Sequence, residues 1–414
     1  MLTRNRLHLD AFSLPAVVVV SALVMLLILF AFSMRTLDFQ YHDAYREQKQ
    51  ERLDLHSAAA LYMCDSTLLD GKDSVCVSLY GDGEDPIWIK RKPWGLYEVV
   101  SLWRTEDDPF AHTYLMGRAA ESSCQAAFWI SNRNTPLSLA GNTTIKGPAY
   151  IPQVGVKYLK IGEREFQGKT LEVEDLHPSQ RFLPRLSMSL WQQLDSLKRL
   201  YDIGVDYHNA QGTPVSFGGP TALVRCNTHK EATFCLSGNV VLFGGRLVIS
   251  KESDIHDIII IARSVVIESG FRGSAQIICA DSILVKPGAR LDYPSGLFVD
   301  SSGQNAPCIT MGENSSVTGY IGIHWGEKYH YVLENPCFRL RKNARVHGLV
   351  YVDGSCELEG AIKGAAYVKD CFYREGHLIY TETLNDVSIE RNDSLAFPIL
   401  LDGPYKRKVA KLVY

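Results

Sequence analysis

The longest uninterrupted hydrophobic stretch lies near the start of the chain. Residues 11–32 read AFSLPAVVVVSALVMLLILFAF and include no charged residue. A helix rises about 1.5 Å per residue, so a run of this length crosses the ~30 Å hydrocarbon core of a bilayer. A cleaved signal peptide is the alternative, but its apolar region is usually about 7–15 residues long. The pattern therefore predicts a transmembrane helix over residues 11–32.

The flanks of this run set its predicted orientation. Arg4 and Arg6 precede the run, whereas acidic residues soon follow it. The positive-inside rule then places residues 1–10 in the cytoplasm and the body outside the inner membrane. The partner of the helix is the lipid bilayer. The side chains that represent this anchor are Phe12, Leu14, Val18, Leu23, Leu27 and Phe30.

Hydrophobic positions take up helical spacing after the apolar run. Neither Gly nor Pro occurs between Ala16 and Asp70, and apolar residues recur every three or four positions. This is the pattern of an amphipathic helix built from good helix formers. The helix is therefore predicted to continue over residues 33–64 as an extension of the anchor.

A different pattern, of short β-branched runs separated by Gly, Asp and Asn, fills residues 236–382. The clearest runs are 240–243, 258–261, 264–267, 276–279, 282–285 and 348–352. Such short strands cannot bury an apolar face alone, and stacking them with parallel pairing gives a continuous core. The predicted fold is mainly β, with a parallel β-helix over 236–382 and a tail over 383–414. A β-sandwich is the alternative, and it would favour longer alternating strands in hairpins.

Between the helix and these runs the sequence predicts a small β-rich head over residues 65–153. Strand-like runs there alternate with turn signals such as Pro93-Trp94-Gly95. Trp88, Trp94, Trp103 and Trp129 are candidates for a sugar-stacking surface, although strand aromatics are ordinary core fillers. A connecting region follows over 154–235, with a helix near 187–201.

The N-terminal segment resembles the type IV pilin and pseudopilin class. The start Ala11-Phe12-Ser13-Leu14, after the short basic leader MLTRNRLHLD, is similar to the Gly-Phe-Thr-Leu start of such helices. Ala16 stands where most members carry Glu, a departure that some minor subunits share. The resemblance implies a membrane-anchored minor subunit of a surface or secretion apparatus.

The C-terminal half resembles bactofilin-type, polymer-forming β-helices. The similarity is carried by the rhythm of glycines and short strands over residues 345–352 and 356–364. Residues 137–147 have the same rhythm and are a candidate opening coil. The resemblance implies the β-helical fold rather than a particular activity.

Candidate chemistry is sparse. Asp281 and Asp300 lie about one predicted coil apart, with Glu268 and Asp292 nearby, but acids are common beside turns. His324 and His330 do not have the i, i+4 spacing of helical metal sites. No phosphate-binding glycine loop or nucleophile elbow occurs. The sequence therefore predicts no catalytic, cofactor-binding or metal-binding residues, and no enzyme.

The ten cysteines and the overall charge bear on disulfides and on nucleic acid binding. No C-x-x-C pair occurs, and the nearest neighbours, Cys64 with Cys76 and Cys226 with Cys235, are candidate disulfides in an oxidising compartment. The chain has 43 basic and 46 acidic residues, which gives no reason to expect nucleic acid.

Three function classes remain open. The first is a membrane-anchored structural or assembly component of the cell envelope that contacts other envelope or secretion proteins. The second is a β-helical module that binds polysaccharide or protein, and the third is a tethered carbohydrate enzyme.

Overall fold

The computed structural model of the chain is mainly β, with one long helix at its N-terminus. The chain divides into two compact units, residues 1–58 and 59–414. Phe12, the first predicted anchor residue, lies outside the described part of the chain. The structure describes residues 13–65, 68–69, 72–81, 86–105, 111–120, 125–200, 205–206, 214–226, 231–301, 306–325, 337–403 and 405–413.

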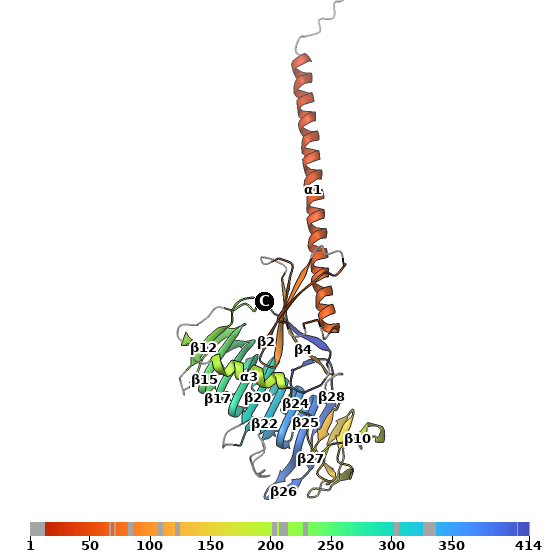
Figure 1. The fold of residues 1–414 in the computed structure, drawn as a ribbon, viewed down its shortest axis with the longest axis vertical. Coiled ribbons are helices and arrows are strands. Elements are labelled where there is room, and N and C mark those ends of the chain that lie inside the picture. Colours follow the sequence, from red (N-terminus) through yellow and green to blue (C-terminus); the bar gives the residue numbers. More distant parts are fainter. Residues whose placement is uncertain are drawn as a thin grey trace, which may run out of the picture. The chain divides into compact units, whose positions relative to one another are not determined.

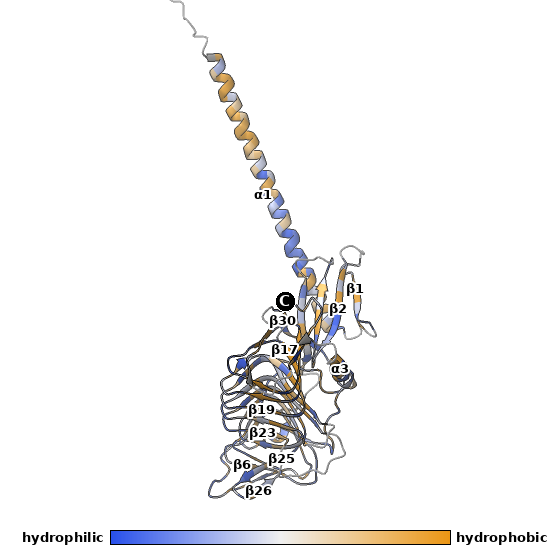
Figure 2. Ribbon diagram, turned by 90° about the vertical axis from the view of Figure 1, so that its left-hand side faces the viewer, coloured by the Kyte–Doolittle hydropathy of each residue, from blue (hydrophilic) through white to orange (hydrophobic). Residues whose placement is uncertain are grey.

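Helix α1 (Ser13–Cys64) is continuous across the predicted anchor and its predicted extension. Its continuity follows from the absence of Gly and Pro after Pro15, which lies in the first turn, where a proline is tolerated. Figure 2 shows hydrophobic residues along its first half and mostly hydrophilic residues further on. The anchor residues that the structure describes, each exposed over more than half of its surface, are Leu14, Val18, Leu23, Leu27 and Phe30.

A six-stranded antiparallel sheet, here called the head sheet, forms part of the second unit. Its order is β1-β2-β3-β4-β29, and β30 also pairs with β4. The first four strands lie in the predicted head, but the last two come from residues predicted as a tail. In that segment, residues 407–413 supply backbone partners for β4. The strands are β1 (Ser74–Val77), β2 (Ile87–Trp94), β3 (Tyr97–Trp103), β4 (His112–Ala119), β29 (Ala396–Phe397) and β30 (Arg407–Val413).

The largest group of strands pairs in parallel and closes on itself; we call it the closed sheet. Its central strands are β15 (Val240–Ile249), β17 (Ile258–Ile267), β19 (Ala275–Val285), β20 (Arg290–Ser301), β22 (Ser316–Trp325), β24 (Arg345–Leu358) and β25 (Ala361–Glu375). Each of them pairs in parallel with the next one along the chain. The predicted short runs are therefore confirmed as strands, and this parallel pairing is not that of a hairpin sandwich.

Shorter strands complete the closed sheet and two small sheets beside it. In the closed sheet these are β5 (Phe128–Ile130), β7 (Thr144–Lys146), β8 (Ala149–Ile151), β10 (Leu176–Pro178), β11 (Val205–Asp206), β12 (Ala222–Cys226), β13 (Glu231–Ala232), β18 (Arg272–Gly273), β21 (Cys308–Met311), β23 (Phe338–Leu340), β26 (Leu378–Thr381) and β28 (Ser388–Arg391). The small sheets contain β14 (Cys235–Ser237), β16 (Asp254–His256), β6 (Leu137–Ala140), β9 (Val156–Tyr158) and β27 (Thr383–Asn385).

Some strands of the closed sheet pair with partners that are distant in the sequence. Strand β25 pairs with β5, and β28 pairs with β7, so residues 128–146 lie beside the C-terminal strands. Residues 137–147, expected as an opening coil, therefore lie next to the C-terminal strands β27 and β28. The predicted helix is confirmed as α3 (Met188–Arg199), which Figure 1 shows lying across the strands of the closed sheet. Beyond it, β12 pairs with β15.

Two apolar cores hold this unit together. One fills the closed sheet with alternate strand residues such as Leu242, Ile260 and Ile277, which are register partners. The other lies on an outer face of the closed sheet and includes Leu194 of α3 and Tyr97 of the head sheet. Because strand side chains alternate between faces, the first residues of β15 and β17 are buried on both sides and read as continuous apolar runs.

A buried amide joins the head sheet to the closed sheet. The side chain of Gln276 accepts a hydrogen bond from Leu96 N at 2.8 Å and donates one to Trp94 O at 3.1 Å. Tyr320 Oη donates to the same amide oxygen at 3.0 Å. Gly95 lies in this turn at φ +59°, and a Cβ there would come within 2.3 Å of the amide. The predicted Pro-Trp-Gly turn therefore needs its glycine for close approach as well as for backbone conformation.

Candidate functional site

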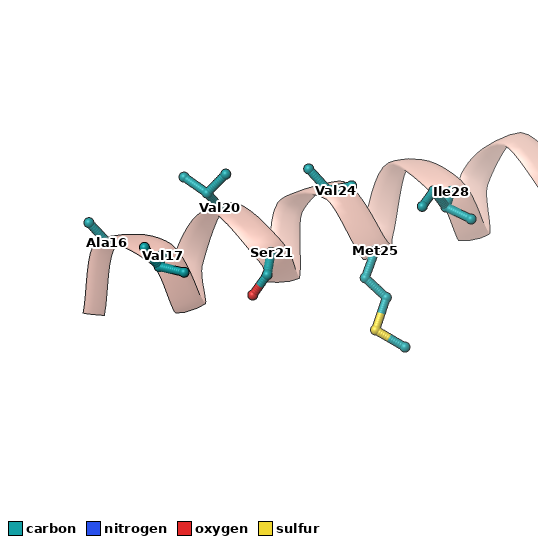
Figure 3. Close-up of a pocket in the computed structure, with 7 residues that line it drawn as sticks. All are labelled: Ala16, Val17, Val20, Ser21, Val24, Met25 and Ile28. Atoms are coloured by element: carbon teal, nitrogen blue, oxygen red, sulfur yellow. The ribbon is translucent and has the colours of Figure 1, made fainter. Parts of the chain in front are cut away.

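Helix α1 has the properties of a membrane-crossing segment. It is long and apolar enough to cross a bilayer once, a property that a signal anchor shares. Figure 3 shows seven side chains of α1 between Ala16 and Ile28, of which only Ser21 carries a polar group. The hydroxyl of Ser21 donates to Val18 O at 2.9 Å, so this polar group is satisfied within the helix. Such internal pairing suits a helix that faces hydrocarbon.

The acids considered for catalysis are engaged in ion pairs with lysines and arginines. Asp281 Oδ2 lies 2.6 Å from Arg263 Nε, and Asp300 Oδ2 lies 3.2 Å from Lys198 Nζ of α3. In the same way Glu268 pairs with Lys286 at 2.7 Å and Asp292 with Arg290 at 2.8 Å. Each of these four carboxylates therefore has a lysine or arginine partner. Their positions fit charge pairing along the strands.

The histidine segment is described only in part. His324 Nδ1 lies 3.9 Å from Asp353 Oδ2, and its ring centroid lies 4.7 Å from that of Trp191 on α3. His330 lies outside the described residues. Within the described ranges, no group of three or more His, Cys, Asp and Glu side chains could hold a metal ion.

Arg133, Asp370 and Glu382 form a charged cluster in which the two carboxyls are buried and the arginine is partly exposed. Arg133 Nε lies 2.5 Å from Asp370 Oδ1, and Asp370 is only 1% exposed. Burial, and then the negative charge of Asp370, raise the pKa of Glu382 to about 8. Two adjacent carboxyls cannot both ionise easily, so such a pair favours sharing one proton. Glu382 is only 8% exposed, whereas the side chain of Arg133 is 39% exposed, so the carboxyls are shielded from solvent and the guanidinium reaches the surface.

This cluster could not be predicted from the sequence, because its three residues come from distant segments. Arg133 follows β5, whereas Asp370 lies in β25 and Glu382 follows β26. No local motif links them. The one unusual local feature, the positive φ of Glu382 at 48°, is visible only in the backbone. Such strained positions are held by the surrounding structure and often mark special sites.

The four tryptophans considered for sugar stacking divide into two pairs. Trp94 is buried, with its ring 5.2 Å from that of Phe217, and Trp129 stacks on Tyr150 at 4.8 Å. These two have core roles. Trp88 and Trp103 instead line an open cavity.

This cavity, here called the Trp88 groove, has a volume of about 1040 Å³. It lies between the head sheet and the turn 217–220. Its aromatic and charged lining residues are Trp88, Trp103, Phe217, Lys90, Lys92 and Arg104. None of its described lining residues is acidic. The sequence signal was the alternation of Trp88, Lys90 and Lys92, because every second residue of a strand lies on one face.

The cysteines lie in unlike surroundings. Cys64 and Cys76 are separate, exposed thiols. Cys226 is buried in the core of the closed sheet, whereas Cys235 is exposed. The two disulfides expected from the sequence stay predictions.

No protein-family profile, curated protein or solved structure matches this chain.

Proposed function

We propose that this protein is a membrane-anchored structural or assembly component of the cell envelope, with its body outside the inner membrane. The observation that carries the proposal is the single apolar half of α1, which is long enough to cross a bilayer and is joined to a large β-rich unit. In the described residues, the acids considered for catalysis are held in ion pairs, which suits a scaffold better than acid–base chemistry.

Within this proposal the closed sheet is a parallel β-helix. Its central strands pair in parallel with their sequence neighbours, as successive coils of such a fold do. Ion pairs on its surface repeat the same spacing, because Arg263 with Asp281 and Arg341 with Glu359 are each 18 residues apart. A stack of this kind is a rigid, extended body that spreads contacts over many residues.

The resemblance of the first helix to pilin-like helices extends the proposal to a minor subunit of a surface or secretion apparatus. In that setting α1 enters the bilayer with residues 1–10 in the cytoplasm. The contacts of the assembly would then be made by the anchor and by the body together. Interfaces of this type depend on apolar and aromatic anchors rather than on one acid.

Protease protection tests the topology. Protease added to intact spheroplasts should digest the body beyond about residue 41 and leave a short membrane-bound fragment. A body that is protected until the membrane is broken would contradict the orientation.

Native gel electrophoresis in mild detergent tests the assembly role. The wild-type chain of 46.3 kDa should migrate in a larger complex, and a body released by a cleavable signal peptide should not. The variants Asp281→Asn and Asp300→Asn serve as matched controls and should keep the complex. A released body that keeps the complex, or a monomeric wild-type chain, would overturn the proposal.

A further inference from the structure

We propose that the Trp88 groove binds an acidic polysaccharide, with sugar rings on the two indoles and carboxylates on the basic side chains. The inference goes beyond the assembly role, because it assigns a ligand class to the head sheet. It rests on the proposed function only for the position of the head sheet outside the inner membrane.

The aromatic part of the groove is a pair of neighbouring indoles. Trp88 in β2 and Trp103 in β3 are register partners on adjacent antiparallel strands. Side chains of directly opposed strand residues lie about 4.5–5.5 Å apart at Cβ, so the two indoles share one face. Trp88 is 41% exposed, so part of its indole is open to solvent on this face. Flat apolar rings with a polar edge suit the apolar faces of sugar rings.

The charged part of the groove continues along the same face. Lys90 and Lys92 follow Trp88 at every second position of β2, and Arg104 follows Trp103. Partial burial, and to a lesser extent the charge of Lys90, lower the pKa of Lys92. A carboxylate of the ligand would relieve the repulsion between the two lysines through charge-assisted hydrogen bonds. The hydroxyls of Ser101 and Thr113, 3.2 Å apart, add neutral hydrogen-bonding groups between the aromatic and basic parts.

The opposite wall of the groove is fixed before any ligand binds. Phe217 is buried against Trp94, and Asn239 Nδ2 donates to Gly219 O at 3.0 Å. Lys92 Nζ donates to Thr221 Oγ1, which ties the turn to the head sheet. A groove whose walls are held in this way loses little conformational entropy on binding.

A polysaccharide fits these features better than a nucleic acid does. The net charge of the chain is −3, so no general attraction draws a polyanion to it and recognition depends on the groove itself. The proposed position outside the inner membrane also places the groove among envelope glycans. Nucleic acid therefore serves as a competing outcome of the test.

Isothermal titration calorimetry on the full-length chain in detergent tests the proposal. The probes are polygalacturonate, neutral pullulan and a single-stranded oligodeoxynucleotide. We expect polygalacturonate to bind more tightly than the other two. Trp88→Ala should weaken its binding roughly tenfold. Lys90→Gln should weaken it less and flatten its salt dependence, because screening acts on the charged contacts.

Matched variants outside the groove separate these effects from general damage. Phe182, which is 72% exposed, and Lys157, which is exposed in β9, provide Phe182→Ala and Lys157→Gln. Both should bind polygalacturonate as the wild-type chain does. Equal binding of pullulan would overturn the acidic preference. Equal binding of the oligodeoxynucleotide, no binding of polygalacturonate, or wild-type affinity in Trp88→Ala would overturn the site.

Discussion

At the scale of single residues, Glu382 combines a strained backbone with a buried carboxyl. Its φ of 48° is rarely adopted by residues other than Gly, Asn and Asp, and its carbonyl accepts a hydrogen bond from Ser138 N at 2.7 Å. The side chain shares its surroundings with Asp370 and Arg133. Because these residues join segments 128–140 and 366–385, we interpret the cluster as a polar contact that fixes the two segments together.

The raised pKa of Glu382, about 8, makes a prediction about stability against pH. An unfolded Glu has a pKa of about 4.3, so the folded chain binds more protons between that value and 8. The stabilisation from this group is therefore complete at low pH and is lost as pH rises through about 8. Glu382→Gln, which cannot ionise, should unfold at a less pH-dependent temperature and be more stable than wild type at pH 8.5, by roughly 1–3 kcal/mol.

Thermal unfolding between pH 5 and pH 9 measures this difference. Glu313→Gln, at an exposed turn position, is the control and should follow the wild-type curve. A Glu382→Gln curve parallel to that of wild type would show that the carboxyl is ionised throughout.

At the scale of elements, much of the secondary structure could be predicted from the sequence. The uncharged run, the absence of Gly and Pro and the helical spacing together gave α1 and α3. The β-branched runs gave the central strands of the closed sheet. Residues 383–414 were missed because their strands are short and pair with distant partners, such as β7 and β4. Pairing of that kind depends on tertiary structure rather than on local sequence.

The two faces of the central strands make a second prediction. Ile260 in β17 is fully buried, whereas Leu284 in β19 is 38% exposed. Ile260→Asp places an unpaired charge in the core and should lower stability by more than about 4 kcal/mol or prevent folding. Leu284→Asp makes the same kind of change on the outer side and should cost no more than about 1 kcal/mol. Urea unfolding of the two variants compares them, and equal losses would show that the assigned faces are wrong.

At the scale of the whole molecule, the sequence did not reveal which strands end up as neighbours. Residues 137–147 carry the rhythm of the C-terminal strands, yet they lie beside the last strands rather than before the first. The chain reaches the other end of the closed sheet through α3. Residues 217–220 likewise meet the tryptophans of β2 and β3 only in the folded chain. The wall of the Trp88 groove that β2 and β3 form could therefore be predicted from strand alternation. The opposite wall, residues 217–220, could not.

An engineered cross-link tests this order of strands. Thr144 in β7 and Ser388 in β28 are register partners, and their hydroxyl oxygens lie 3.4 Å apart. Neighbouring strands are about 4.7–4.9 Å apart, within the Cα separation that a disulfide accepts. The double variant Thr144→Cys/Ser388→Cys should therefore form a disulfide under mild oxidation and join residues 244 apart. The linked peptide is detected by mass spectrometry after proteolysis.

The same measurement tests whether β7 lies beside β21 instead of β28. Thr310 in β21 lies between strands β19 and β23 and does not pair with β7. The double variant Thr144→Cys/Thr310→Cys should therefore give no linked peptide. Closing so long a loop should also raise the unfolding temperature of the first double variant, by an amount that reflects roughly 4–5 kcal/mol when the bond is unstrained. Reduction should return it to the wild-type value. Linkage in the second pair, or none in the first, would mean that residues 128–146 do not continue the ladder of the C-terminal strands.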